Sequence, residues 1–172
     1  MYEFTYYRVG DVMTSDPISI NKDARISDVE RIFEEHDFNG IPIVDNKDHL
    51  VAMITKLDVL KAFSFRKDSK IPKYKDIMSQ KISSLVTKDP YSVHLETPCT
   101  RVLNDLVKKR IKSIPVVEGG CLVGIIARED ILHALRLASQ GILPERIASS
   151  NPLASAGVEK KYTQMFRNFS AW

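Results

Sequence analysis

The chain has 172 residues, 44% of them hydrophobic, and its 25 basic and 22 acidic residues leave a net charge of +3 at pH 7. That length can bury a core, and the small excess of positive charge does not demand a nucleic-acid partner. No apolar run approaches the roughly 20 residues of a membrane span, and the first twelve residues hold no apolar signal core, so we expect a cytoplasmic protein without membrane contact. Cys99 and Cys121 lack metal-site spacing, so neither a metal centre nor a disulfide is expected.

The first half of the chain predicts one small α/β unit. Apolar residues recur at helical spacing in 24–36, where Ile26 and Val29 share a face, and Gly40 follows the expected helix end. Shorter apolar runs bounded by turn residues fit strands. After a short extended N-terminal segment and a helical turn, the expected order is strand, helix, strand, strand, helix, at 18–20, 24–36, 41–45, 50–55 and 58–65.

A basic stretch, 64–74, separates this unit from the second half, and Pro72 prevents a continuous helix there. The apolar spacing of 76–86 then predicts one connecting helix. Gly119 and Gly120 predict a tight turn between two strands. The second half is expected to hold a helix, two strands and a closing helix, at 100–112, 114–118, 121–127 and 129–137.

The two halves are copies of one unit. A shift of 73 residues lays 14–44 on 87–117, and after the loss of one loop residue a shift of 72 lays 50–60 on 122–132. So regular a match indicates a tandem duplication, and a unit of roughly 60 residues is marginal alone, so we expect the copies to share one core and to hold a ligand at their seam. The predicted divisions are unit one, a linker with the connecting helix, unit two, and a linker with a docking helix, at 1–65, 66–84, 85–138 and 139–172.

The start of unit two is ambiguous, because both 77–79 and 86–88 resemble 12–15. We prefer the later alignment, which keeps Asp89, Pro90 and Ser92 in register without a gap.

The end of the chain changes in composition. Residues 141–157 are rich in Pro, Ser and Gly, which is typical of a loop. Bulky apolar residues then recur at helical spacing over 158–169 and predict a short amphipathic helix. Such a helix is marginal alone, so we expect it to dock, either on its own body or on a partner.

The candidate functional residues lie where a buried strand turns into a helix. Asp58 follows the strand 50–55, and Asp130 follows the strand 121–127. Backbone N–H groups at such a helix start can hold a phosphate together with the hydroxyl of Thr55, and Asp58 can accept from sugar hydroxyls. The alternative is that both carboxylates only stabilise their helix starts, with Thr55 as an N-cap.

The duplicated pattern resembles a tandem pair of cystathionine-β-synthase-type (CBS) domains, called a Bateman module. The resemblance rests on Val12-Met13-Thr14, on the strands 41–45 and 114–118, and on the two strand-to-helix stretches, and it covers residues 9–137. It implies two βαββα units packed sheet to sheet, with clefts for adenosine-containing ligands such as AMP, ADP, ATP or S-adenosylmethionine.

By the same resemblance, each site would combine residues of both units. The implied contacts are ribose at Asp58 and Asp130, phosphate at Thr55, Arg128 and Lys112, and adenine at Thr14, Phe38, Asn39, Gly40, Met53, Thr87, Ile111, Ser113 and Ile125.

Two residues depart from the family pattern. The family prefers Gly where Ala52 stands, and we expect the extra methyl group to crowd a ligand. Ala127 replaces a Ser or Thr and so removes a phosphate-binding hydroxyl, for which Arg128 is expected to compensate. The Asp58 site therefore ranks first.

The resulting hypothesis is a non-catalytic, energy-sensing regulatory module that needs no cofactor, binds an adenine nucleotide as ligand and forms a homodimer through its helices. The alternative is an adaptor for nucleic acid or protein that uses the basic linker 66–75 and the helix 158–169. An enzyme is the least favoured class, because no catalytic combination of Ser, Cys, His and carboxylate residues clusters in the sequence.

Overall fold

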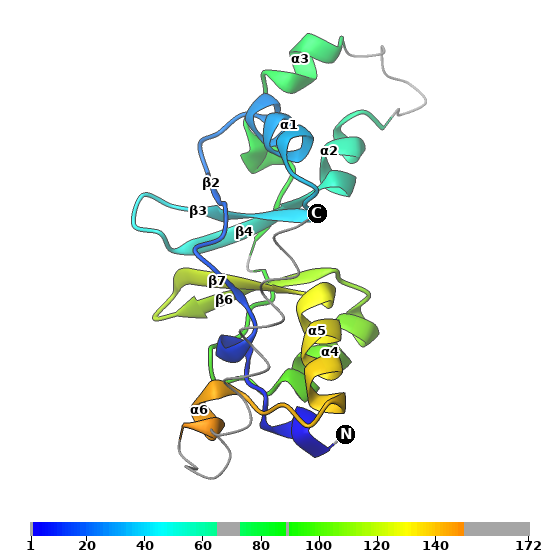
Figure 1. The fold of residues 1–172 in the computed structure, drawn as a ribbon. Coiled ribbons are helices and arrows are strands. Elements are labelled where there is room, and N and C mark those ends of the chain that lie inside the picture. Colours follow the sequence, from blue (N-terminus) through cyan, green and yellow to red (C-terminus); the bar gives the residue numbers. More distant parts are fainter. Residues whose placement is uncertain (1, 65–72, 89, 150–172) are drawn as a thin grey trace.

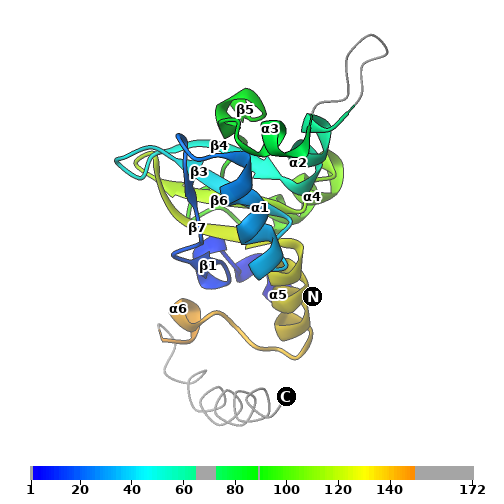
Figure 2. The same ribbon diagram turned by 90° about the horizontal axis from the view of Figure 1, so that it is seen from above.

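The computed structural model describes residues 2–64, 73–88 and 90–149. Two α/β units lie one above the other, with their sheets facing each other at the centre and their helices on the outer sides (Figure 1). In the view from above, β3 and β4 of one unit overlie β6 and β7 of the other (Figure 2). The expected pair of βαββα units packed sheet to sheet is therefore confirmed.

The first unit follows the predicted element order. Its elements are β2 (Ile20–Asn21), α1 (Ile26–Glu35), β3 (Gly40–Val44), β4 (Leu50–Thr55) and α2 (Lys56–Ala62). Helix α1 begins where Asp28 Oδ2 accepts a hydrogen bond from the backbone N–H of Arg25 at 2.9 Å. Ile26 and Val29 on its apolar face are fully buried against the sheet.

The second unit repeats this arrangement. Its elements are α4 (Cys99–Lys109), β6 (Ser113–Glu118), β7 (Cys121–Ala127) and α5 (Arg128–Ser139), followed by α6 (Glu145–Ala148). The predicted Gly119–Gly120 turn is confirmed, and both glycines have positive φ angles, 57° and 86°. Arg110 ends α4 with a φ of 54°, a conformation that a residue with a Cβ adopts at some cost.

A short strand from the start of each half joins the sheet of the other half. Strand β1 (Thr14–Ser15) pairs with β7, and β5 (Thr87–Lys88) pairs with β4. Thr14 lies opposite Ile125 and Thr87 lies opposite Met53. The two registers match under the shifts of 73 and 72 residues, so the exchange supports the later alignment for the start of unit two.

The buried residues form two hydrophobic clusters rather than the single shared core that we expected. The cluster of the second unit includes Phe4, Tyr7 and Val9, which come from the 3-10 helices η1 (Tyr2–Tyr6) and η2 (Val9–Asp11) and the turn between them. The cluster of the first unit includes Ile77, Met78 and Ile82, from α3 (Tyr74–Met78) and η3 (Ile82–Ser84). The segment that precedes the first unit thus completes the core of the second, and the segment that precedes the second unit completes the core of the first.

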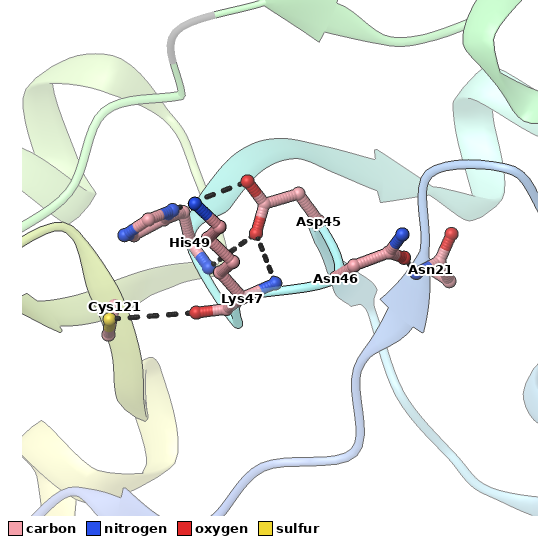
Figure 3. A network of polar contacts seen from close by, with 6 residues as sticks. All are labelled: Asn21, Asp45, Asn46, Lys47, His49 and Cys121. Carbon is pink, nitrogen blue, oxygen red and sulfur yellow. Dashed lines mark hydrogen bonds and ion pairs between the residues drawn. The ribbon is translucent and has the colours of Figure 1, made fainter.

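The tips of the two β-hairpins are joined at one end of the cleft between the sheets. The backbone N–H of Leu50 donates to Gly120 O at 3.1 Å, and that of Leu122 donates to Asp48 O at 2.9 Å. Figure 3 shows the turn beside them, where Asp45 accepts from the backbone of Lys47 and His49 at 2.8 and 3.0 Å. These bonds hold the β3–β4 turn in a fixed shape against the second unit.

Two predicted elements were wrong. The connecting helix expected at 76–86 is interrupted, because Gln80 O accepts from the N–H of Ile26 and the N–H of Ile82 donates to Ala24 O. These bonds to the first unit replace the bonds that would continue the helix, so α3 ends at Met78. The N-terminal segment expected to be extended is the 3-10 helix η1.

Other predictions meet the limits of the described residues. The predicted helix 158–169 and the linker residues 65–72 lie outside them. Among residues 2–64, 73–88 and 90–149, no helix is long and apolar enough to cross a membrane. The same part of the chain holds no cluster of three or more potential metal ligands.

Candidate functional site

A cavity of about 520 Å³ lies at the seam between the two units. This volume falls in the range of small-molecule sites. Below, it is called the Asp58 cavity. The residues that line it are Asn39, Met53, Thr55, Lys56, Leu57 and Asp58 from the first unit and Pro90, Tyr91, Arg110, Ile111, Lys112, Ser113 and Pro115 from the second.

The turn from β4 into α2 places Thr55 and Asp58 at the cavity. Thr55 caps the helix, because its Oγ1 accepts from the N–H of Asp58 at 3.2 Å. Asp58 Oδ2 accepts in return from the backbone N–H and the hydroxyl of Thr55, at 2.9 and 2.6 Å. The helix-start role that we considered as the alternative is therefore present, and it holds the carboxylate in a fixed position beside the cavity.

Asp58 is ionised in this setting. Partial burial raises its pKa, but hydrogen bonds from Lys61 and Thr55 outweigh burial and hold the pKa of Asp58 below its usual value. Lys61 Nζ donates to Asp58 Oδ1 at 2.8 Å. An ionised carboxylate offers about four acceptor positions, and the three bonds named here leave capacity on Oδ1 for a further donor.

The rim of the cavity is basic. Lys56, Arg110 and Lys112 all line it, and Asp58 is the one carboxylate among the lining residues. Lys112 Nζ donates to Asn39 Oδ1 at 3.0 Å, which ties the second unit to the first across the seam. Lys56 Nζ also lies 3.4 Å from Asp37 Oδ1, which offsets part of its charge. The net positive charge of the lining residues favours a ligand that carries negative charge.

Tyr91 brings an aromatic ring to the cavity, and sequence reasoning missed it. Its hydroxyl donates to Asp105 Oδ2 at 2.5 Å, and this bond raises the pKa of Tyr91. Lys109 Nζ lies 4.5 Å from the centre of the ring. The ring is thus held by α4 in a single orientation. Lys56, Leu57, Pro90 and Pro115 were also missed as lining residues.

Most residues predicted for the Asp58 site come together. Asn39, Met53, Thr55, Asp58, Ile111, Lys112 and Ser113 all line the cavity. The backbone of Thr87 lies beside the cavity strand through its pairing with Met53, while its side chain is outside the described part.

The face around Asp130, which is the counterpart of the Asp58 cavity in the second unit, is built differently. Asp130 Oδ2 accepts from the N–H of Ala127 at 2.7 Å. Burial raises the pKa of Asp130, the opposite direction from Asp58. Thr14 pairs with Ile125 at this face through β1. Gly40 is buried and pairs with Thr55, and the half-buried ring of Phe38 stacks on His36 at 4.9 Å.

Arg128 Nε donates to Ile111 O at 3.0 Å, and the side chain lines the groove between α4 and α5. Its role as a substitute for the missing hydroxyl at Ala127 stays a prediction. One expectation about the Asp58 side needs correction. Ala52 was expected to crowd a ligand, but it is 2% exposed and belongs to the hydrophobic cluster of the first unit. Its neighbour Met53 is the residue that lines the cavity.

The comparisons with known proteins agree on one family. The model of the CBS domain matches the chain twice, at residues 9–64 and 82–137. The L-aspartate semialdehyde sulfurtransferase of Methanocaldococcus jannaschii is 29% identical over 124 residues, which are 72% of this chain and 22% of that protein. The chain therefore matches less than a quarter of the length of this curated relative.

Solved structures give the same result for the fold. CBSX2, described in complex with AMP, is 23% identical, with a TM-score of 0.66 over 77% of this chain and 98% of the other. The CBS domain pair of protein MJ0100, described in complex with 5-methylthioadenosine and S-adenosyl-L-methionine, is 26% identical, with a TM-score of 0.63 over 76% of this chain and 97% of the other.

Proposed function

Because this chain belongs to the CBS domain family, we propose that it is a non-catalytic regulatory module that binds an adenosine-containing ligand in the Asp58 cavity. The observation that carries the proposal is the cavity itself, which joins both units around an ionised carboxylate and three cations. Relatives of this fold described with AMP, 5-methylthioadenosine or S-adenosyl-L-methionine support the ligand class.

Different side chains of the cavity suit different parts of the ligand. The free capacity of Asp58 Oδ1 suits the donating hydroxyls of a ribose. Met53 and Ile111 come from opposite units and offer apolar contact to the faces of an adenine ring. Lys112 and Arg110 are suited to a phosphate, since cations attract it, while the hydroxyl of Thr55 donates to Asp58 and so orients the carboxylate.

Calorimetric titration of the full chain tests the proposal. AMP, ATP and S-adenosylmethionine are titrated into protein at about 100 μM, a concentration that detects micromolar binding. We expect heat from at least one of them and a loss of about tenfold or more in affinity in Asp58→Asn, since this change leaves one acceptor oxygen for the ribose. Glu96→Gln is the matched control, because Glu96 is exposed and lies outside the cavity lining. No heat with any of the three ligands would refute the proposal.

A ligand regulates only if it binds one arrangement of the protein better than another. We place the responding surface on the helices. The groove of about 270 Å³ between α4 and α5 is lined by five apolar residues, Leu103, Leu106, Val107, Ile131 and Leu132, and by Arg110 and Arg128. Val107 and Leu132 are 68% and 66% exposed, so a second copy of the chain that covers this groove would remove apolar surface from water.

Sedimentation velocity tests the homodimer. The natural chain is expected to sediment as a dimer, and Leu132→Lys as a monomer, because Arg110 and Arg128 also line the groove and a further buried cation beside them is costly. Tyr2→Lys is the control, since Tyr2 is 88% exposed and does not line the groove. A monomeric natural chain would contradict the dimer without affecting the ligand proposal. The expected cytoplasmic location stays a prediction.

The adaptor alternative gains no support here. The linker residues 66–72 and the helix 158–169, on which it depends, lie outside the described residues. The proposed function therefore rests on the Asp58 cavity alone.

A further inference from the structure

The duplication allows the two faces of the seam to be compared position by position. The shift of 72 residues lays Lys56 on Arg128, Asp58 on Asp130 and Lys61 on His133. The shift of 73 lays Asp37 on Arg110 and Asn39 on Lys112. The register of β1 on β7 and of β5 on β4 follows the same shifts, so the strands that border the two faces are equivalent in space as well as in sequence.

The comparison shows opposite charge at equivalent positions. Around Asp58, the cations Lys56, Arg110 and Lys112 face one carboxylate. At the equivalent positions around Asp130, Arg128 and Lys112 are the cations, because Lys112 takes the position that Asn39 holds in the Asp58 cavity, while Asp37 and Asn39 take the positions of Arg110 and Lys112. The position of Leu57 is taken by Glu129, so the equivalent set has three carboxylates for two cations, against one carboxylate for three cations among the lining residues of the Asp58 cavity.

The hydrogen bonds follow the same division. Asp58 accepts from an ammonium group and a hydroxyl in addition to a backbone N–H. Asp130 accepts from the backbone N–H of Ala127, and the nearby carboxylate of Glu129 adds to burial in raising its pKa. Arg128 is engaged by Ile111 O and lies in the α4–α5 groove. Lys112 Nζ is bonded to Asn39 and lines the Asp58 cavity, so a phosphate at the Asp130 face would meet more negative than positive charge.

We infer that the chain binds one phosphate-bearing adenine nucleotide, in the Asp58 cavity, and that the equivalent face around Asp130 rejects nucleoside phosphates. The inference rests on the proposed function and adds the ligand class and the stoichiometry. It follows that AMP binds more tightly than adenosine, which has no phosphate, and more tightly than S-adenosylmethionine, whose sulfonium carries positive charge.

Arg110 has a special place in this selectivity. It ends α4 in the left-handed conformation, at a position where Gly or Asn is the less costly choice. The side chain lines the Asp58 cavity from there. The strained backbone thus holds a guanidinium group, whose planar fork matches phosphate oxygens.

Isothermal titration of the full chain with AMP, adenosine and S-adenosylmethionine tests the inference. We expect one AMP per chain, bound at least about tenfold more tightly than adenosine at low salt, with the preference falling as salt screens the cations. The variant Arg110→Asn/Lys112→Asn removes two cations, and Asn tolerates the φ angle at position 110. It should bind AMP and adenosine with affinities within about threefold of each other, since the charge that favours the phosphate is largely gone.

The control variant is Lys22→Asn/Lys47→Asn, which removes the same charge from two exposed residues outside the cavity lining. It should keep the preference for AMP. A second measurement titrates AMP into Asp130→Asn, which should bind one AMP with the affinity of the natural chain if the Asp130 face takes no nucleotide.

The outcomes separate the two claims. Two AMP molecules per chain, a loss of about tenfold in AMP affinity in Asp130→Asn, or equal affinities for AMP and adenosine in the natural chain would each overturn the inference while the proposed function stands. Loss of adenosine binding along with AMP binding in Arg110→Asn/Lys112→Asn would also overturn it, because the two cations would then support the cavity rather than select the phosphate. No binding of any adenosine compound would refute the proposed function itself.

Discussion

The exchanged strands contain a pair of positions whose side-chain sizes are reversed between the two halves. An added Cβ at Gly124 would stand 3.0 Å from both Met13 Cε and Thr14 O, and closer still to Met13 Sδ. The equivalent positions in the other half hold Ala52 and Val86. Gly124 is smaller than its counterpart Ala52, and Met13 is larger than its counterpart Val86. The smaller strand residue thus accompanies the larger entering residue.

This arrangement predicts strong coupling between two substitutions. Gly124→Ala should lower the free energy of unfolding by about 1–3 kcal/mol, because overpacking forces side chains and backbone to move. Met13→Val should cost about 1–2 kcal/mol through the apolar surface that it removes. The double variant reproduces the Ala52 and Val86 pair, so we expect it to cost less than about 1 kcal/mol, well below the sum of the single costs.

Urea denaturation followed by circular dichroism measures all four free energies of unfolding. Ile18→Val is the control partner for Gly124→Ala, because Ile18 is 42% exposed and is not among the atoms close to Gly124. The cost of this control pair should equal the sum of its parts within about 0.5 kcal/mol. If Met13→Val/Gly124→Ala is additive to the same degree, the argument from reversed sizes is wrong.

Three further predictions concern single side chains. Thr55→Ala, which copies Ala127, should lower the free energy of unfolding by about 1 kcal/mol through loss of the helix cap, as urea denaturation will show; an unchanged value would mean that the cap is dispensable. Folding lowers the pKa of Asp58, so this residue stabilises the fold above its unfolded pKa and loses the effect as the pH falls through its lower folded pKa. Folding raises the pKa of Asp130, so ionised Asp130 destabilises the fold as the pH rises toward neutrality. Asp130→Asn should therefore raise the melting temperature at pH 7 and Asp58→Asn should lower it, and equal shifts would contradict the assignment. Burial raises the pKa of Cys99 to about 12, so a thiol reagent at pH 8 should label Cys121 in the native chain and both cysteines only in denaturant; rapid native labelling of Cys99 would show that its site opens.

Much of the fold could be predicted because its signals are local. The strands 50–55 and 121–127 have the predicted bounds, since each is a run of apolar residues that is followed, three residues after its end, by a carboxylate that caps the next helix. The helix predicted at 58–65 begins earlier, at Lys56, because Asp58 is the third residue of the helix and caps Thr55 from within. Local patterns thus identify elements better than their ends.

The interruption of the connecting helix could not be predicted in the same way. The apolar spacing of 76–86 fits a helix, but the backbone at Gln80 and Ile82 pairs with the segment around Arg25 in the first unit. This bonding depends on contacts between distant parts of the chain, which periodicity does not report. The exchange of β1 and β5 between the sheets has the same origin.

The candidate site was predicted from motifs, and the residues outside the motifs were missed. Tyr91 and Arg110 reach the Asp58 cavity from the second unit, and neither belongs to the repeated stretch around Asp58. A signal was present in the sequence, because the charge is reversed where Asp37 is laid on Arg110, as it is where Asp28 is laid on Arg101 and Glu35 on Lys108. Comparison of the copies for their differences would have identified Arg110.

Each half of the protein needs a segment that leads into the other half to complete its core. Phe4, Tyr7 and Val9 complete the core of the second unit, and Ile77 and Ile82 complete the core of the first. A chain that ends after α2 would lack the residues that fill its own interior, while its first residues would have no interior to enter. We therefore expect the protein to melt in a single calorimetric transition, and evolution to preserve or lose the two copies together.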